Sequence, residues 1–552
     1  MAQEHVPVLI VGAGGAGLSL SLLLLQQGIP SLLIERRSGI SWYPRARNLN
    51  FRTLEIFRGL GLEAEVRAAG TRVSRLFRKQ SLASSEHEEL LDPASLVEHL
   101  EEISPEPFVW YCPQSQLEPL LLAEAGRRGG EVRYGTELVS FTQDETGVTA
   151  AMKDRTTGKS YALRSDYLIA ADGAHSKIRE TLGMPTKGLG EIPERQIFVY
   201  FRADWSELIR NYEADAIMIV NEDVRGMFLV TDHDRGMFII IYSPSPEESA
   251  QDYTAERCKG LILSAIGKPD IAVEIVDMAH WQPIQRVADR FQEGRVFLVG
   301  DAAHTMPPKM GLGVNTAIQS AQNLAWKLAA VLKGNATPQL LATYQTERHP
   351  VGWLAAEQSL TGPAAALFEK EIGGGTLHPL EKQLPILHPV IGYRYRSEAI
   401  LSEDTATPSP DGIELLDRPE LNGLPGTRVP HLWVERQGQR ISTLDLLDGR
   451  FVLLTGTGGT AWCEAAAVVA VDLGIALSAY RIGPDADLFD LEKGWQTKMG
   501  MSSEGAVLVR PDGFVAWRSS TLPTTPGLQL EQVLAHILCR NTTREHVVIE
   551  SR

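Results

Sequence analysis

The sequence has little cysteine and a deficit of positive charge, and each of these shortages excludes a class of protein. Only four of its 552 residues are cysteine, and no two of them have the Cys-x-x-Cys spacing of a metal or redox pair. So few cysteines exclude a disulfide framework and indicate a reducing cytosol. Lys plus Arg number 53 against 69 Asp plus Glu, a net charge of −16. This balance disfavours nucleic acid and anionic membrane as partners, because both would repel an acidic surface.

Long apolar runs are also missing from the beginning of the chain. The apolar block at residues 22–25 ends at two glutamines, whereas a membrane span needs about 20 apolar residues. The first five residues lack the basic cluster of a signal peptide. We therefore expect a cytoplasmic protein with no membrane partner, and the cysteine and histidine spacings predict no metal site.

The length and the changes of pattern along the chain predict several domains, because a single core rarely exceeds about 250–300 residues. Strands and helices alternate over residues 1–185 and again over 285–365. Between them, short strands and turn residues over 186–284 predict an inserted antiparallel sheet. Residues 366–430 predict a helical or linker region, and 431–545 predict a compact α/β unit.

Residues 7–35 have the pattern of a β-α-β unit that binds a dinucleotide. A short apolar strand leads into the run Gly-Ala-Gly-Gly-Ala-Gly that starts at Gly12, and a helix and a second strand follow. Gly12 permits the tight turn, Gly14 lets the backbone approach a diphosphate, and Gly17 lets helix and strand pack closely. The helix N-terminus then directs its amides at the phosphates.

The second strand of this unit ends at Glu35, an acid that can accept hydrogen bonds from a ribose hydroxyl. Because strand, turn, helix, strand and acid occur in the right order, the segment predicts dinucleotide binding. It does not select the dinucleotide, since Arg36 and Arg37 would also suit a 2′-phosphate.

Two later strands also end at an aspartate. Asp172-Gly173 closes an apolar strand, and taken alone this pair favours a surface turn. Asp301 follows a second apolar strand, where a charge needs a polar partner such as ligand hydroxyls. His304 could carry a proton, but a hydrogen bond that fixes the loop is the favoured interpretation.

Together these three segments resemble the p-hydroxybenzoate hydroxylase-type, or class A, flavoprotein monooxygenases, which have the same motifs in the same order over residues 5–360. Residues 442–540, with the run Val-Arg-Pro-Asp-Gly at 509–513, resemble the thioredoxin-like C-terminal domain of the phenol hydroxylase and polyketide hydroxylase branch. The resemblance implies an α/β FAD-binding domain (Rossmann-like, glutathione reductase-type), an inserted β-sheet substrate domain and a C-terminal thioredoxin-like α/β domain.

The resemblance also implies cofactor contacts at matching positions, while it assigns no catalytic residue. Arg45 matches an arginine that reaches the phosphates, Gln114 a flavin-contacting glutamine, and Asp301 the acid on the ribityl chain. The full set of expected FAD-binding residues is Gly12, Gly14, Gly15, Ala16, Gly17, Glu35, Arg36, Arg45, Gln114, Asp172, Gly300, Asp301, Pro308, Gly313, Val314 and Asn315.

Three features depart from the family pattern. Arg47 and Asn48 lie in a stretch that is commonly more apolar. The residues after the two prolines at 307 and 308 include Lys309 and Met310 where glycines are usual, so the loop beside the flavin ring is expected to differ in shape. Cys463 stands alone where a redox thioredoxin has a Cys-x-x-Cys pair. We therefore expect the C-terminal unit to be structural or to support a homodimer.

The implied activity is that of a single-component monooxygenase. It would use FAD, O2 and NADPH or NADH to hydroxylate a phenolic or polycyclic, polyketide-like aromatic substrate through a flavin hydroperoxide. NADPH is favoured over NADH by the resemblance alone. Epoxidation or Baeyer–Villiger oxygen insertion on the same scaffold is the first alternative, and a non-catalytic flavin-binding protein is the second.

Overall fold

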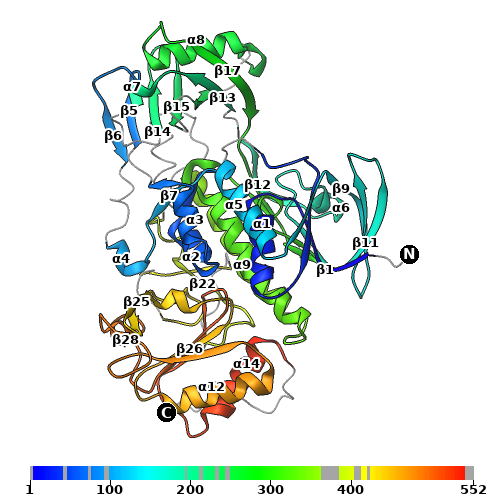
Figure 1. The fold of residues 1–552 in the computed structure, drawn as a ribbon, viewed down its shortest axis with the longest axis vertical. Helices are drawn as coiled ribbons and strands as arrows, with labels where there is room; N and C mark the ends of the chain where they lie inside the picture. The colour runs from blue at the N-terminus through cyan, green and yellow to red at the C-terminus, as the bar shows by residue number, and fades with distance from the viewer. Residues whose placement is uncertain are drawn as a thin grey trace.

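The computed structural model describes residues 4–41, 46–72, 76–91, 99–192, 195–209, 216–230, 235–242, 249–361, 384–402, 412–418 and 423–540. Three units follow one another along its long axis (Figure 1). A β unit lies at one end, an N-terminal α/β unit in the middle and a C-terminal unit at the other end. None of the helices in the described part of the chain combines the length and the apolar character that a membrane-spanning helix needs.

The N-terminal α/β unit is built on an eight-stranded sheet with a parallel centre. Its main path is β19 (Gln292–Glu293), β20 (Val296–Leu298), β11 (Ser160–Ala170), β1 (Glu4–Val11), β2 (Ser31–Glu35) and β8 (Glu131–Tyr134). The hairpin of β9 (Thr136–Gln143) and β10 (Val148–Asp154) extends from β11. The predicted β-α-β unit is confirmed, because β1 and β2 pair in parallel on either side of a helix.

Helices cover this sheet and make its core. They are α1 (Gly15–Gln26), α2 (Phe51–Gly59), α3 (Glu63–Ala68), α4 (Leu100–Ile103), α5 (Gln114–Arg127), α6 (Lys177–Thr181), α9 (Leu312–Leu332) and α10 (Gln339–Thr361). The apolar run in α1 is buried from Gly17 to Leu24, as expected for a helix that is apolar on all sides. α10 was not predicted from the sequence, and it contains Pro350. A small sheet of β3 (Asn48–Asn50), β7 (Val109–Tyr111) and β4 (Thr71–Arg72) adjoins α2.

The β unit is a seven-stranded sheet with one helix-covered face. Its order is β17 (Val273–Trp281), β13 (Arg195–Ala203), β16 (Arg235–Tyr242), β15 (Arg225–Val230), β14 (Ala216–Val220), β5 (Leu76–Lys79) and β6 (Glu88–Leu91). α8 (Ala255–Ile266) packs on one face, with the short α7 (Ser206–Ile209) at its edge. The antiparallel meander is confirmed, but the expected range 186–284 misses β5 and β6, which come from the earlier segment 76–91. β5 pairs with β14, and β6 pairs with β5.

A three-stranded ribbon of β12 (Thr186–Glu191), β18 (Ile284–Ala288) and β21 (His304–Thr305) links the β unit to the N-terminal unit. Beyond α10, the described parts of the region expected to be a linker form turns and the pair β22 (Tyr393–Arg394) and β23 (Glu414–Leu415). Residues 362–383, 403–411 and 419–422 of that region lie outside the described residues.

The C-terminal unit has the sheet order β27 (Leu477–Arg481), β26 (Phe451–Thr455), β29 (Ala506–Val509) and β30 (Val515–Ser519). β27 is parallel to β26, and the other pairs are antiparallel. α12 (Thr460–Leu473) and α14 (Pro526–Ile537) pack against it. A second sheet of β25 (Gln439–Ser442), β24 (Trp433–Arg436) and β28 (Phe489–Asp490), with α13 (Gly494–Thr497), completes the unit. The expected strand, helix, strand and hairpin pattern is confirmed.

A buried network of charges joins the C-terminal unit to the N-terminal unit. Arg510, after β29, donates to both carboxylate oxygens of Glu347 on α10, at 2.7 and 2.9 Å. Lys327 on α9 donates to the same carboxylate at 2.8 Å, and Asp512 accepts from Arg510 at 3.0 Å. All four side chains are at most 1% exposed. Burial would raise the pKa of Glu347, but Arg510 and Lys327 hold it well below its usual range.

Candidate functional site

Four adjacent parallel strands, β20, β11, β1 and β2, end at the same edge of the N-terminal sheet. Backbone hydrogen bonds of 2.8–2.9 Å join neighbouring strand ends, namely Gly12 N to Ile34 O, Ala171 N to Val11 O and Val299 N to Ala170 O. Each strand leads into one of the predicted motifs. The fold therefore places Gly12, Glu35, Asp172 and Gly300 at one edge, where ligands of open α/β sheets bind.

The glycine turn after β1 has two kinds of glycine. Gly12 has a φ of +112°, and a Cβ there would overlap the carbonyl oxygen of Ala171. A Cβ on Gly17 would in turn overlap the carbonyl oxygen of Gly12. Gly14 and Gly15 have more room, because an added Cβ would find its nearest neighbour at 3.7 and 3.5 Å. Gly12 and Gly17 are therefore needed for close packing, and Gly14 and Gly15 keep the backbone open beside the N-terminus of α1.

Glu35 at the end of β2 fixes the turn. One of its carboxylate oxygens accepts from the backbone N–H of Ala13 at 3.0 Å, and the other accepts from the backbone N–H and Nε of Arg37 at 2.9 and 3.0 Å. Burial would raise the pKa of Glu35, but these hydrogen bonds lower it. The acid is therefore ionised, and it lies at the strand end where a ribose acceptor is expected. Arg36 is exposed beside it.

Asp172 has a buried oxygen available to a ligand. Its Oδ2 accepts a long bond of 3.4 Å from Ile178 N, while Oδ1 is buried without a hydrogen-bond partner among the described residues. Burial raises the pKa of Asp172. Arg179 ties this segment to the next motif, because it donates to Ala302 O at 3.0 Å and Ala174 O at 3.1 Å.

The segment from Gly300 to the start of α9 closes the edge. An added Cβ on Gly300 would lie 3.0 Å from Ala16 Cβ and 3.3 Å from Ala317 Cβ, so this turn packs between α1 and α9. Asp301 and Pro308 are exposed. Asp301 follows the apolar strand β20 and lies in the 3-10 turn Gly300–Ala302, where it is exposed at the strand-end edge.

Asn315 in the first turn of α9 is used by the protein itself. Its Oδ1 accepts from Asn50 N at 3.0 Å, and its Nδ2 donates to Asn48 O at 2.9 Å and Gly311 O at 2.6 Å. The side chain thus fixes the loop. The backbone amides of Gly313, Val314 and Asn315, which the sequence predicts as cofactor contacts, remain the groups that could meet a ligand. Gly313 and Val314 are half-buried beside it.

α5 contributes Gln114 and a residue that the sequence did not single out, Glu118. Gln114 is half-buried and donates to Glu118 Oε1 at 2.5 Å. Glu118 is 0% exposed, and burial raises its pKa. Glutamate is common on exposed helix faces, so only its position four residues after Gln114 could have pointed to it. Arg45 lies outside the described residues.

His304 does not make the expected loop-fixing hydrogen bond. Both ring nitrogens are buried without a partner in the described part of the chain, and the ring packs 5.9 Å from that of Phe291. Burial, with the positive charge of Arg348, lowers the pKa of His304 to about 3. The side chain is therefore a neutral part of the core, and a proton-carrying role is disfavoured.

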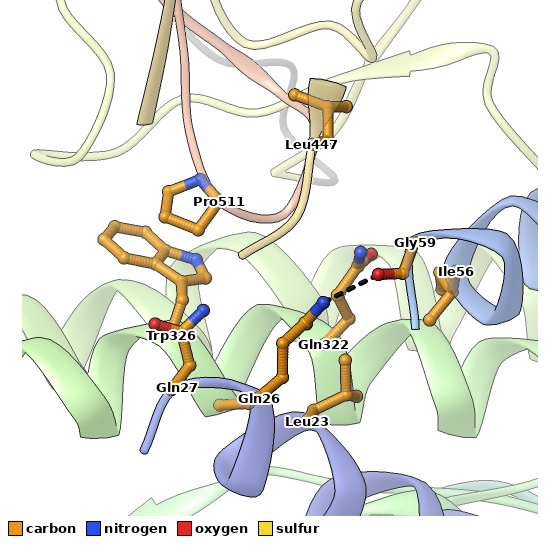
Figure 2. A pocket seen from close by; sticks show the side chains of 10 residues that line it. Leu23, Gln26, Gln27, Ile56, Gly59, Gln322, Trp326, Leu447 and Pro511 are labelled. Carbon is orange, nitrogen blue, oxygen red and sulfur yellow. Dashed lines mark hydrogen bonds between the residues drawn. The ribbon is translucent and has the colours of Figure 1, made fainter. Parts of the chain in front are cut away.

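A separate hollow of about 310 Å³, which includes open solvent, lies between the N-terminal and C-terminal units. Figure 2 shows Gln26 and Gln27 at the C-terminal end of α1, Gln322 and Trp326 from α9, and Pro511 from the C-terminal unit around it. Gln26 Nε2 donates to Gly59 O at 2.7 Å. The hollow lies at the C-terminal end of α1, so the length of that helix separates it from the glycine turn.

Comparisons with known proteins place these features in a family. Residues 5–359 match the FAD binding domain, and residues 422–540 match the aromatic-ring hydroxylase C-terminal domain. The chain is 39% identical to a 4-methyl-5-nitrocatechol 5-monooxygenase of Burkholderia sp, over 97% of this chain and 98% of the relative. It is 40% identical to a putative polyketide hydroxylase of Streptomyces halstedii, over 97% of each chain.

A solved structure extends the likeness to three dimensions. The ternary complex of aklavinone-11 hydroxylase with FAD and aklavinone superposes with a TM-score of 0.89 at 36% identity, over 98% of this chain and 100% of that one. The predicted family, fold class and cofactor are thereby confirmed. The alternative of a flavin-binding protein without activity is set aside, since the named relatives are monooxygenases and hydroxylases. The chain belongs to the FAD-binding aromatic-ring hydroxylases and is an FAD-dependent aromatic monooxygenase.

Proposed function

We propose that the chain hydroxylates a fused-ring phenol of the polyketide type, with NADPH as reductant and O2 as oxidant. The observation that carries the proposal is the convergence of three motifs at one sheet edge in a chain that is similar along its whole length to hydroxylases of such compounds. FAD supplies the chemistry when bound, because it accepts hydride and activates O2 for transfer of one oxygen atom to the ring.

The residues at the sheet edge fit this cofactor. The open backbone at Gly14 and Gly15 would hold its diphosphate at the N-terminus of α1. Glu35, ionised at the end of β2, would accept from its adenosine ribose. Asp172, whose buried Oδ1 has no partner in the described part of the chain, would accept one further hydrogen bond.

The rest of the expected set lies around the same edge. Ala16 and Gly300 bring α1 and the 300–302 turn into contact, while Asp301 and Pro308 are exposed on the side open to a ligand. The amides of Gly313, Val314 and Asn315 begin α9, where the helix dipole would stabilise negative charge on the flavin. Gln114, Arg36 and Arg45 remain predicted contacts. A cytoplasmic location and a homodimer also remain predictions.

The substrate would lie against the second face of the β unit. α8 covers one face and lies outermost in Figure 1, so the other face is the one on the side of the FAD-binding domain. That face has an apolar cluster of Leu76, Tyr200, Met227, Leu229, Met237 and Ile239. Methionine adapts its shape and makes favourable contacts with aromatic rings. A wall of this kind suits a broad, flat, apolar ring system better than a small polar one.

A single-ring nitrocatechol is the second candidate. It is favoured by the 39% identity to the Burkholderia nitrocatechol monooxygenase, which is nearly equal to the identity to the polyketide hydroxylase. Product analysis would also identify epoxidation or Baeyer–Villiger insertion.

The test is a turnover assay with both ring classes. FAD-loaded protein is given NADPH and either a tetracyclic hydroxyquinone or 4-methyl-5-nitrocatechol, and NADPH oxidation and product mass are followed. We expect the tetracycle to stimulate NADPH oxidation and gain one oxygen. Met237→Ala should raise its KM, whereas Ile240→Val on the α8-covered face should not. Turnover of the nitrocatechol alone would contradict the polycyclic substrate class.

A further inference from the structure

Glu118 is a buried acid directly beside the proposed diphosphate site. Its side chain is 0% exposed, and its Oε1 would lie 3.7 Å from a Cβ built on Gly14. The backbone N–H of Gly15, the first residue of α1, acts on this carboxylate and lowers its pKa, although burial has the larger effect. The acid thus lies beside the N-terminal amides of α1, which have no partner within the helix.

Only one oxygen of Glu118 has a side-chain partner. Oε1 accepts from Gln114 Nε2 at 2.5 Å, while Oε2 is buried without a hydrogen-bond partner among the residues that the structure describes. A buried carboxylate with one unpaired oxygen is costly, whereas a carboxylic acid has an O–H on that oxygen that can donate to an acceptor.

The charges around Glu118 do not fully compensate its burial. Glu35 and Arg37 at the end of β2 and Tyr134 on β8 act on it. Arg37 lowers the pKa of Glu118 more than Glu35 raises it, but burial has the larger effect and Arg37 is shared with Glu35 at 3.0 Å. Burial raises the pKa of Tyr134 to about 12, so that it is neutral. A diphosphate at Gly14 and Gly15 would add further negative charge, and like charge disfavours the ionised form of an acid.

We propose that Glu118 takes up one proton from solvent when FAD binds, so that a neutral carboxyl shares the N-terminus of α1 with the diphosphate. The inference rests on the FAD site proposed above. Glu118 is then a positioning residue that makes the affinity for FAD depend on pH. In this step the Glu118 carboxylate and one proton from solvent form the carboxylic acid, and no other bond changes.

The test is calorimetric titration of the apoprotein with FAD from pH 6 to 9, in phosphate and in Tris at each pH. The dependence of the measured heat on the ionisation heat of the buffer gives the protons taken up. For wild type we expect uptake rising towards one proton per FAD, and an affinity that falls up to tenfold per pH unit in the upper part of the range. Glu118→Gln should take up none and bind FAD with a pH-independent affinity.

Two further variants assign the proton. Asp172→Asn removes another carboxyl at the edge that has a buried, unpaired oxygen, and Glu124→Gln removes a buried acid of the same helix as Glu118, which is paired with Arg128 at 2.5 Å. Both should still take up the proton. Uptake that survives in Glu118→Gln, or is lost only in Asp172→Asn, would overturn the inference.

If Glu118→Gln does not fold, wild type alone decides. The infrared difference spectrum of FAD binding should gain the C=O band of a protonated carboxyl. FAD binding without proton uptake and without that band overturns the role of Glu118 and leaves the proposed function intact. No FAD binding at any pH overturns both.

Discussion

Two of the buried polar regions in the described part of the chain differ in how completely their groups are paired. In the network between the units, Glu347 accepts from Arg510 on both carboxylate oxygens and from Lys327 on one of them. Asp512 accepts a further hydrogen bond from Arg510. At the strand-end edge, Asp172 Oδ1 and Glu118 Oε2 are buried without partners in the described chain. Native proteins rarely leave such atoms unpaired. The paired region therefore serves structure, and the unpaired region is shaped for a ligand.

The network gives the C-terminal unit a role that does not need thiol chemistry. Arg52 on α2 donates to Asp512 O at 2.7 Å and to Gln322 on α9 at 2.9 Å. The same two helices begin beside the Asn50–Asn315 contact, where the flavin is proposed to lie. We propose that the C-terminal unit braces α2 and α9, and so holds the flavin loop in place.

The largest expected effect is the loss of the shared carboxylate. Glu347→Gln would leave one buried positive charge of the pair Lys327 and Arg510 uncompensated, since Asp512 would still bind Arg510, and this should cost about 3–5 kcal/mol of the free energy of unfolding. Chemical denaturation of the variant measures this loss. Glu357→Gln, an exposed position on the same helix, is the control and should change it by less than about 0.5 kcal/mol. Equal stability of the two variants would contradict the structural role of the network.

The next effect separates the ligand edge from the network. Gly17→Ala would force the carbonyl of Gly12 aside and displace the N-terminus of α1. FAD affinity should fall about 100-fold, which corresponds to about 2.7 kcal/mol. Gly126→Ala, on α5 with nothing within 4 Å of the added Cβ, should bind FAD as wild type does. Fluorescence titration with FAD measures both, and an unchanged Gly17→Ala would contradict the placement of the diphosphate.

A smaller effect concerns His304, which is unpaired although it is packed against Phe291 in the core. Its pKa is about 3 in the folded protein against an ordinary value of 6.5. As the pH falls below 6.5 the unfolded chain binds a proton that the folded protein refuses, so stability is lost by up to about 1.4 kcal/mol per pH unit. His304→Phe should reduce this acid sensitivity in thermal melts from pH 7 to 4. His280→Gln, an exposed control, should retain it.

The smallest effect is expected at Cys463. It is partly buried on α12, and burial raises its thiol pKa to about 11, which disfavours the reactive thiolate. Cys463→Ser should therefore leave the rate of NADPH oxidation unchanged. A loss of turnover that a reductant restores would show thiol chemistry in the C-terminal unit.

Local patterns predicted the parts of the fold that are set by neighbours in sequence. The glycine turn, Glu35 and the two later strand ends were predicted because each one directly follows an apolar strand in the sequence. The parallel sheet then brings the carboxyl ends of these strands to one edge. The β5–β6 hairpin was misplaced because its partner β14 is more than 100 residues away, and α10 was missed at Pro350, which usually interrupts a helix.

The polar details of the site depend on contacts that no spacing reveals. Glu347 and Arg510 are 163 residues apart, and nothing in either segment marks the pair. Glu118 has the sequence of a surface helix position, yet the structure buries it. Burial of a charge is decided by tertiary packing, so it could not be predicted from these segments alone.

The central claim is that this chain binds FAD at the strand-end edge and inserts one oxygen atom into an aromatic ring. The most direct test is to record the absorbance spectrum of the purified protein with FAD, then supply NADPH, 18O2 and a tetracyclic phenol and measure the product by mass spectrometry. The account predicts a bound-flavin spectrum, NADPH oxidation stimulated by the phenol, and a product carrying one labelled oxygen. A protein that takes up no flavin, or bound flavin that oxidises no NADPH with any aromatic ligand, would contradict it.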